Sequence, residues 1–529
     1  MFDILLRGGT VIDGTGRAAF AADAAIENGK IAAVGQLSGA QARQVVDCTG
    51  MTVTPGFIDI HRHADGAAFR PDFGVWELRQ GLTTIVNGNC GLSAAPFGAA
   101  NDGAIRAYLQ PITGTLPEGL DSRSMEGYFR SLPELPLNMG MLVGGGTLRA
   151  DAAGYRLTEL TEGHFDAIHR AMERALAEGA LGVSLGLGYA PECFYSTGEL
   201  IRALQPLAGT DIPVTVHMRQ EGGGVAESVE EMIAVARALG CPVHISHLKA
   251  MGRDNWGKKI PQVLALLDQA RADGLRVDCD VYPYTAGSTQ LLHILPPDYL
   301  TGGMEAVVER LRDKNVRREL AARIESGVGF DDIAKLAGWD GIYLTSLHCP
   351  EDHPYQGHNL MEIAALMGQD PLSSCCELLA REHGQITMID FMASEEDICE
   401  ILRWPQSCVI SDATYPTEGQ LHPRVCGNVT HLLEHFVEEK KALMWEQAVH
   451  KLTERPAQVL HLRGKGRLET GYDADVCVFD PKAIHECASY TDPCETSLGM
   501  RHVLVNGGFA IRDGEMTGEK NGKIIKREA

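Results

Sequence analysis

The chain lacks any long uninterrupted apolar run, although 44% of its 529 residues are hydrophobic. No segment approaches the roughly 18 consecutive apolar residues that cross a bilayer, so the sequence predicts no membrane-spanning helix. The opening residues MFDILLRGGTVIDGTG place Asp3 and Arg7 close to the start, which does not fit a secretory signal peptide. We therefore expect a cytoplasmic protein that has no membrane partner.

Basic charge is also scarce, with 47 Lys and Arg against 70 Asp and Glu and a formal net charge of −23. Nucleic-acid binding needs a basic face, so this balance argues against a nucleic-acid partner. The 14 cysteines show no spacing typical of a disulfide framework. They fit free thiols in a reducing compartment, of which one or two could carry chemistry.

The length of 529 residues is too great for one compact core, so at least two domains are expected. Residues 1–51 and 464–529 read as short strands with Asp-Gly and Asn-Gly turns, and we expect them to form one small β-sandwich domain from both termini. Residues 52–463 alternate apolar strand-like runs with helical stretches. This alternation predicts an α/β fold, a (β/α)₈ TIM barrel.

A charged helical stretch at about 291–346 interrupts the alternation of the predicted barrel. Most of it is the stretch LPPDYLTGGMEAVVERLRDKNVRRELAARIES. We interpret it as an insertion beside the barrel mouth. A lid over the mouth is one role for it, and a passive insertion is the other.

Side chains able to bind zinc follow several predicted barrel strands. Catalytic residues of such barrels lie at the carboxyl ends of the strands, and these ends would bring together His61, His63, Cys90, His217, His247 and Asp412. The apolar runs that lead into them are TPGFIDI, LTTIVNGN, IPVTV, PVHIS and SCVIS. The repeated coincidence of strand end and ligand-type residue predicts a metal site at the barrel mouth.

These residues differ in how strongly each one indicates a metal. His61 and His63 would share one face of a strand, a pattern that two ordinary strand histidines also give. A buried cysteine is usually a small packed side chain, but the surroundings of Cys90, NGNCG, are too polar and glycine-rich for packing. His244 lies three residues before His247, and we expect it to face the other side of the strand as a packed histidine.

Imidazoles combined with one thiolate suit Zn²⁺ rather than Mg²⁺ or Ca²⁺, which prefer oxygen ligands. A further absence bears on the same site, because no lysine occurs between Lys30 and Lys249. Many two-metal barrel hydrolases bridge their ions with a carbamylated lysine from a middle strand, which this chain cannot supply. Cys90 is the obvious substitute.

Several longer stretches carry a resemblance to a known family: PGFIDIHRHAD, GLTTIVNGNCGLSAAP, EGALGVSLGLGYAP, VHMRQEGGG, HISHLKAMGRDNWGK, DVYPYTAGST, SDATYPTEGQLHPR and RPAQVLHLRGKGRLETGYDADVCVFDP. They span nearly the whole chain. With them the sequence resembles the amidohydrolase superfamily, and within it the N-acyl-D-amino-acid deacylases (D-aminoacylases). This resemblance implies a (β/α)₈ barrel with a β-sandwich built from both termini.

The resemblance also implies roles for individual residues. Cys90, His217 and His247 would hold a tightly bound zinc, with a second, weaker position formed by His61, His63 and Asp412. Asp412 would also be the general acid/base. Residues associated with the substrate carboxylate and its pocket would be Lys249, Tyr282, Ser288, Arg424 and Tyr189.

The chain departs from the family pattern at three positions, none of which removes a ligand. Arg62 stands between the first two histidines where a small polar residue is usual, and Ala64 follows them where an acidic one is common. Ala413 takes the place of the glycine that commonly follows the catalytic aspartate. These changes leave the substrate preference open.

The leading hypothesis is zinc-dependent hydrolysis of N-acyl-D-amino acids. A second hypothesis keeps the barrel and the metal but changes the substrate to a dipeptide, a cyclic amide or another carboxylated amide. The missing lysine argues against the hydantoinase-like and dihydroorotase-like subtypes. A third is a non-catalytic scaffold of the same fold, which should purify without metal. The side-chain and acyl preference, the number of zinc ions, and the choice between monomer and homo-oligomer stay open.

Overall fold

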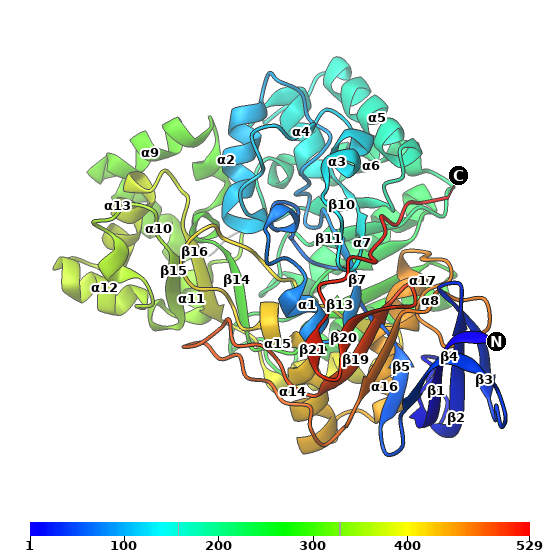
Figure 1. Ribbon diagram of the computed structural model, residues 1–529. Coiled ribbons are helices and arrows are strands. Elements are labelled where there is room, and N and C mark those ends of the chain that lie inside the picture. The colour runs from blue at the N-terminus through cyan, green and yellow to red at the C-terminus, as the bar shows by residue number, and fades with distance from the viewer. Residues whose placement is uncertain (157, 327–328, 529) are drawn as a thin grey trace.

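The protein, described here by a computed structural model over residues 1–156, 158–326 and 329–528, is built around a closed parallel β-barrel (Figure 1). One sheet contains β6 (Phe57–Asp59), β7 (Leu82–Asn87) and β8 (Asn138–Met141). The other contains β9 (Val143–Gly144), β10 (Val183–Gly186), β11 (Val214–His217), β12 (Val243–Ile245), β13 (Val277–Val281) and β17 (Ser407–Val409). Only Leu142 separates β8 from β9, and a parallel bridge from Arg62 to Ala413 closes the ring. The predicted (β/α)₈ barrel is confirmed.

The barrel strands are largely buried on both faces because helices cover the outside of the barrel. Every residue of β7 is buried. Among the covering helices, α7 (Val225–Leu239) buries Val225, Val229, Met232 and Ala236, which recur at helical spacing, and it ends at Gly240 with φ 70°. None of the helices in the described part of the chain is both long and apolar enough to cross a membrane.

The remaining helices around the barrel complete its wall and its loops. They are α1 (Val75–Arg79), α2 (Asp102–Thr113), α3 (Met125–Ser131), α4 (Gly145–Ala153), α5 (Glu162–Ala177), α6 (Thr197–Ala203), α8 (Lys259–Ala272), α14 (Glu395–Arg403), α15 (Arg424–His431), a π-helix at Leu432–Glu439, α16 (Trp445–Leu452) and α17 (Glu454–Val459).

The two ends of the chain meet in one nine-stranded sheet, so both termini contribute to one β region, as predicted. The first end supplies β1 (Phe2–Val11), β2 (Phe20–Glu27), β3 (Lys30–Gly35), β4 (Ala42–Asp47) and β5 (Thr52–Pro55). The other supplies β18 (Val476–Phe479), β19 (Met500–Val505), β20 (Gly508–Arg512) and β21 (Glu515–Met516). The halves join where β5 pairs antiparallel with β18. The sheet therefore includes the 4 residues of β5, just past the predicted boundary at residue 51.

A compact unit is inserted between β13 and β17, beside the barrel (Figure 1). It contains β14 (Ala286–Gln290), α9 (Met304–Arg312), α10 (Lys314–Ser326), α11 (Ile333–Ala337), β15 (Ile342–Ser346), α12 (Leu360–Met367), α13 (Pro371–Arg381) and β16 (Thr387–Phe391). Its three strands form their own antiparallel sheet in the order β14-β16-β15, and its helices share a separate apolar core. The unit thus extends beyond about 291–346, because β16, far along the chain, returns to pair with β14.

Candidate metal centre

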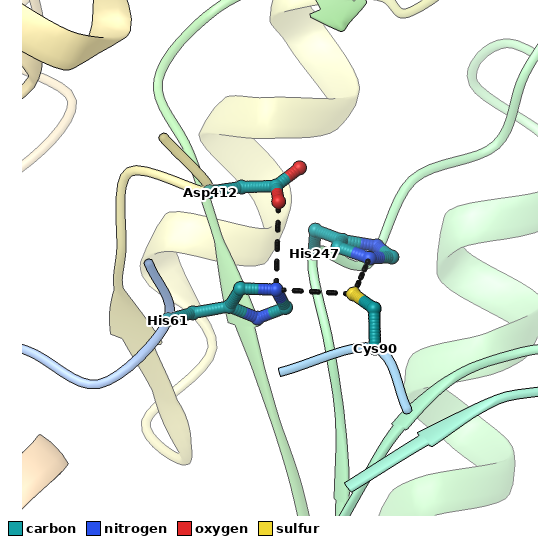
Figure 2. Close-up of side chains that lie close together, drawn as sticks. All are labelled: His61, Cys90, His247 and Asp412. Atoms are coloured by element: carbon teal, nitrogen blue, oxygen red, sulfur yellow. Dashed lines mark hydrogen bonds and ion pairs between the residues drawn. The ribbon is translucent and has the colours of Figure 1, made fainter. Parts of the chain in front are cut away.

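Four of the predicted ligands converge at the carboxyl ends of different barrel strands (Figure 2). His61 follows β6, Cys90 follows β7, His247 follows β12 and Asp412 follows β17. The Cys90 Sγ atom lies 3.2 Å from His61 Nε2 and 3.5 Å from His247 Nε2. Asp412 Oδ1 lies 3.4 Å from His61 Nε2. One donor atom from each residue falls within 4.8 Å of the others, a spacing that a single metal ion could span.

His63 and His217 each contact one member of this group. His63 Nε2 lies 3.3 Å from Asp412 Oδ1, and His217 Nδ1 lies 3.0 Å from His247 Nε2. All six side chains selected from the sequence therefore meet at one barrel mouth. Two overlapping groups result, one around Asp412 and one around His247, and Cys90 lies between the His61 and His247 imidazoles.

Three of the converging residues have an unusual backbone conformation. Cys90, His247 and Asp412 have φ values of 53°, 37° and 52°. Non-glycine residues rarely adopt this left-handed region, which costs on the order of 1–3 kcal/mol and concentrates at functional sites. At each position the chain turns sharply where a strand ends, and the backbone N–H of Asp412 donates to the carbonyl of His61 at 2.9 Å. The strained backbone conformations thus direct the side-chain donor atoms of these residues toward one point.

Asp280, on β13, supports two of these histidines and was missed in the sequence. Its Oδ2 atom lies 3.6 Å from His61 Nδ1, while Oδ1 accepts the backbone N–H of His247. Burial raises the pKa of Asp280, but attraction to His244 and its hydrogen bond, with a smaller contribution from nearby His61, outweigh burial and hold the pKa well below its usual range. An ionised carboxylate at Nδ1 leaves Nε2 of His61 free for a metal.

Glu221, in the loop after β11, contacts Nδ1 of His247 in the way that Asp280 contacts His61. Glu221 was not identified from the sequence either. Glu221 Oε1 lies 2.9 Å from His247 Nδ1, and Glu221 Oε2 accepts a hydrogen bond of 2.8 Å from Lys249 Nζ. Burial raises the pKa of Glu221, but attraction to Lys249, then to the histidines, holds it well below its usual range. The only sequence signal was an acidic residue four positions beyond a strand end.

The protonation states at the centre fit a zinc site. Burial lowers the pKa of His63 to about 4 and holds that of His217 well below its usual range, so both imidazoles are neutral donors. Burial and the nearby carboxylate of Asp412 hold the pKa of the Cys90 thiol well above its ordinary value. Such a thiol ionises when a cation lies against it. Neutral imidazoles, one thiol and a carboxylate are the donor set that zinc prefers.

Asp412 is held in its ionised form. Burial raises its pKa, but attraction to Arg424 and a hydrogen bond from His63 outweigh it and keep the pKa well below its usual range. Arg424 Nη1 lies 3.0 Å from Asp412 Oδ2, on the side away from the histidines. The carboxylate therefore has one oxygen at the centre and the other fixed by a guanidinium.

A cavity opens above the centre and is lined by His217, His247 and Asp412 together with most of the residues predicted to contact substrate. Lys249, Tyr282, Ser288 and Tyr189 are among its lining residues. The Tyr189 ring stacks on His217 at 4.2 Å between centroids. Arg424 is fully buried behind this wall, where it donates to the Ser288 carbonyl at 3.1 Å and lies 4.8 Å from the Tyr282 ring centre.

Of the departures from the family pattern, Arg62 lies away from the metal centre. Arg62 points opposite to His61 and His63 and is completely buried. Its guanidinium contacts Glu77 at 3.0 Å and Asp59 at 3.2 Å, and it also donates to the Tyr415 hydroxyl. Burial lowers its pKa, but these partners outweigh burial and raise it. Arg62 therefore stabilises the barrel wall without entering the cavity.

His244 is packed in the barrel wall, as predicted, but it is also charged. Its Nδ1 lies 2.6 Å from Asp278 and its Nε2 lies 2.8 Å from Asp280. Burial lowers the pKa of His244, but attraction to the two carboxylates outweighs it and holds the pKa well above its usual range. Instead of being a metal ligand, His244 neutralises the carboxylate that orients His61.

Comparisons with known proteins agree with this geometry. The sequence model described as "Amidohydrolase family" matches residues 44–510. The chain is 33% identical to D-aminoacylase of Alcaligenes xylosoxydans xylosoxydans, covering 100% of this chain and 98% of that protein. It is 35% identical to N-acyl-D-glutamate deacylase of the same organism, covering 100% of this chain and 97% of that protein.

Solved structures give the same result. A D-aminoacylase variant in complex with copper chloride matches with a TM-score of 0.84 at 32% identity, covering 100% of both chains. N-acyl-D-glutamate deacylase of Bordetella bronchiseptica, complexed with zinc and a phosphonate inhibitor, matches with a TM-score of 0.82 at 32% identity, covering 99% of this chain and 100% of that one. The chain thus belongs to the amidohydrolase family, and its predicted resemblance to the N-acyl-D-amino-acid deacylases within that family is confirmed.

Proposed function

We propose that this protein hydrolyses the amide bond of N-acyl-D-amino acids, releasing a D-amino acid and a carboxylate, with zinc at the barrel mouth. The observation that carries this proposal is the position of Asp412, which faces His61 and His63 with one oxygen and Arg424 with the other. Its support is the full-length similarity to proteins named D-aminoacylase, N-acyl-D-glutamate deacylase and N-acyl-D-aspartate deacylase.

Cys90, His217 and His247 would hold one zinc ion tightly, and His61, His63 and Asp412 would form a second, weaker position beside it. The Cys90 thiol supports this assignment, since it lies between the nitrogens of His61 and His247 at 3.2 and 3.5 Å. Zinc, when bound, lowers the pKa of a water molecule to about 7 and polarises the acyl carbonyl.

Asp412 would be the general base and then the general acid. Its Oδ1 atom, 3.3 Å from His63 Nε2, is placed to accept a proton from the attacking water. The same oxygen would return the proton to the departing amide nitrogen, while Arg424 keeps the carboxylate oriented through Oδ2. Proton transfer by a positioned side chain contributes on the order of 10²–10⁴ in rate.

The substrate would enter through the cavity, with its carboxylate near Lys249, Tyr282 and Ser288 and with Tyr189 covering His217. The cationic heads of Lys249 and Arg424 are engaged with Glu221 and Asp412. A substrate carboxylate in the cavity would therefore have to share Lys249 with Glu221, since Arg424 is buried behind the cavity wall. Leu295, Pro297 and Phe330 of the inserted unit line the same cavity, which supports a lid role for this unit. A cytoplasmic location is also proposed, and it fits the free thiols found at all 14 cysteines.

The experiment that tests this function is amine release by the zinc-loaded protein from paired N-acetyl-D- and N-acetyl-L-amino acids. The panel contains methionine, leucine, glutamate and lysine. Turnover confined to the D-isomers is the expected result. Zinc-loaded protein that turns over neither isomer would contradict the proposal and direct attention to a dipeptide or a cyclic amide.

A further inference from the structure

Asp390 is a carboxyl group in the substrate cavity that the proposed reaction does not use. It lies on β16, opposite Gly287 of β14, and its residue is only 3% exposed. It lines the same cavity as His247 and Asp412. A Cβ on Gly287 would lie 2.5 Å from Met392 Cε and 3.0 Å from Asp390 Oδ1. Met392 and the Asp390 carboxyl therefore pack closely against Gly287, where a larger side chain would displace them.

The Asp390 carboxyl has no side-chain partner among the residues that the structure describes. Among the residues that the structure describes, none except Asp390 itself, through its own backbone N–H, donates a hydrogen bond to it, and none forms an ion pair with it. An ionised carboxylate can accept about four hydrogen bonds, and a buried one left without partners is unfavourable. Burial accordingly raises the pKa of Asp390 to about 7, against the attraction of Lys249 and Arg424.

The other carboxyl groups of the cavity all have partners. Asp412 pairs with Arg424 at 3.0 Å, and Glu221 pairs with Lys249 at 2.8 Å. Asp331 accepts the backbone N–H of Gly222 at 3.1 Å and that of Glu221. Among the described carboxyl groups of this cavity, Asp390 is thus the one that accepts no hydrogen bond from another residue and has no ion-pair partner.

The cations of the cavity are already engaged. Lys249 Nζ contacts Glu221 at 2.8 Å and His247 Nδ1 at 2.9 Å. Arg219 pairs with Glu231 at 3.1 Å and also donates to a backbone carbonyl at 3.0 Å. Burial lowers the pKa of His293 to about 3, so this histidine is neutral. Among the described lining residues, no unpaired cation is therefore available to bind an acidic side chain of a substrate.

We propose that Asp390 determines the side-chain specificity of the protein by accepting the cationic end of the substrate, so that N-acyl derivatives of D-lysine and D-arginine are preferred over neutral and acidic ones. This inference deepens the proposed function and rests on it. Met251 and Met392 pack together in the wall of the cavity. Their flexible apolar side chains suit the methylene stem of a long basic side chain.

The test compares kcat/KM for N-acetyl-D-lysine, N-acetyl-D-arginine, N-acetyl-D-leucine and N-acetyl-D-glutamate in zinc-loaded wild type and in Asp390→Asn. Asparagine keeps the shape of the side chain and removes its charge. We expect the variant to lose about 10- to 100-fold on the lysine and arginine substrates and to keep its activity on leucine, since hydrogen bonds between charged groups are worth that much. Asp331→Asn is the matched control, because the carboxyl of Asp331 is bonded to the backbone, and it should not discriminate among the substrates.

Two results would overturn the inference: a wild-type preference for leucine or glutamate, or an equal loss on all substrates in Asp390→Asn. The second would indicate that Asp390 acts on a part common to all the substrates and not on their side chains. Calorimetric binding of free D-lysine and D-leucine to both proteins separates this inference from the proposed function. If no amide is hydrolysed, weaker binding of D-lysine to the variant still supports the cation subsite, and equal binding contradicts it.

Discussion

The carboxylate of Asp280 lies 3.6 Å from Nδ1 of His61, and its other oxygen accepts the backbone N–H of His247. One side chain therefore fixes the ring of one predicted ligand and the strained backbone of another, whose φ is 37°. Partners of this kind orient metal-binding histidines and commonly change metal affinity 10- to 100-fold when they are removed.

Replacing Asp280 with asparagine should therefore weaken zinc binding by about 10- to 100-fold. Zinc titration against a competing chelator measures the effect. Asp278→Asn is the matched control, because Asp278 contacts the opposite nitrogen of His244 at 2.6 Å and is not a partner of His61. Equal zinc affinity in the two variants would show that Asp280 does not act through His61.

Replacing Cys90 with alanine should lower the zinc content of the purified protein, since its Sγ lies within 3.2–3.5 Å of two predicted histidine ligands. Metal analysis after dialysis measures the loss. Cys375→Ala removes an equally buried thiol from α13 of the inserted unit and should keep its zinc. Full zinc occupancy in the Cys90 variant would rule out the thiol as a ligand.

Replacing Arg62 with methionine should lower the free energy of unfolding by about 3–5 kcal/mol, because it leaves buried carboxyls without their cation. Glu77 and Asp59 contact this guanidinium at 3.0 and 3.2 Å. Denaturant unfolding gives the change, and metal analysis of the folded protein should show unchanged zinc. Zinc loss without a change in stability would instead assign Arg62 to the metal centre.

Replacing His244 with glutamine should also destabilise the protein by about 3–5 kcal/mol, because the charges of Asp278 and Asp280 lose their shared partner. The folded-state pKa of His244 is raised above the unfolded value of about 6.5. Its contribution is therefore complete below about pH 6.5 and is lost as pH rises through the raised folded-state pKa. The free energy of unfolding, measured from pH 6 upward, should differ less between wild type and variant as the pH becomes alkaline. A difference that stays constant with pH would mean that His244 is neutral.

The sequence predicted the barrel and the convergence of the ligand-type residues because both follow from short-range patterns. Each of His61, Cys90, His247 and Asp412 comes directly after an apolar strand-like run. Parallel strands in a closed barrel bring such positions to one end. Both termini also show short strand-like runs separated by Asp-Gly or Asn-Gly turns. This shared pattern predicted that they would form one β region, which β5 and β18 join.

The sequence could not predict the residues that orient the ligands or stabilise the barrel wall, because their contact partners are distant in sequence. Asp280 alternates with Asp278 in β13, a pattern that a solvent-facing strand also gives, and its contact with His61 spans more than two hundred residues. The role of Arg62 was also beyond the sequence, because its hydrogen bond to Tyr415 forms only when the barrel closes. The inserted unit was placed too narrowly for the same reason, since the pairing of β14 with β16 links strands that helices separate.

The most direct test of the account is a zinc titration of chelator-treated protein, with hydrolysis of N-acetyl-D-lysine and N-acetyl-D-methionine followed at each step. The account predicts no hydrolysis without metal and activity that rises with bound zinc in wild type but not in Cys90→Ala. Full activity in metal-free protein, or zinc-saturated wild type that cleaves neither substrate, would contradict it.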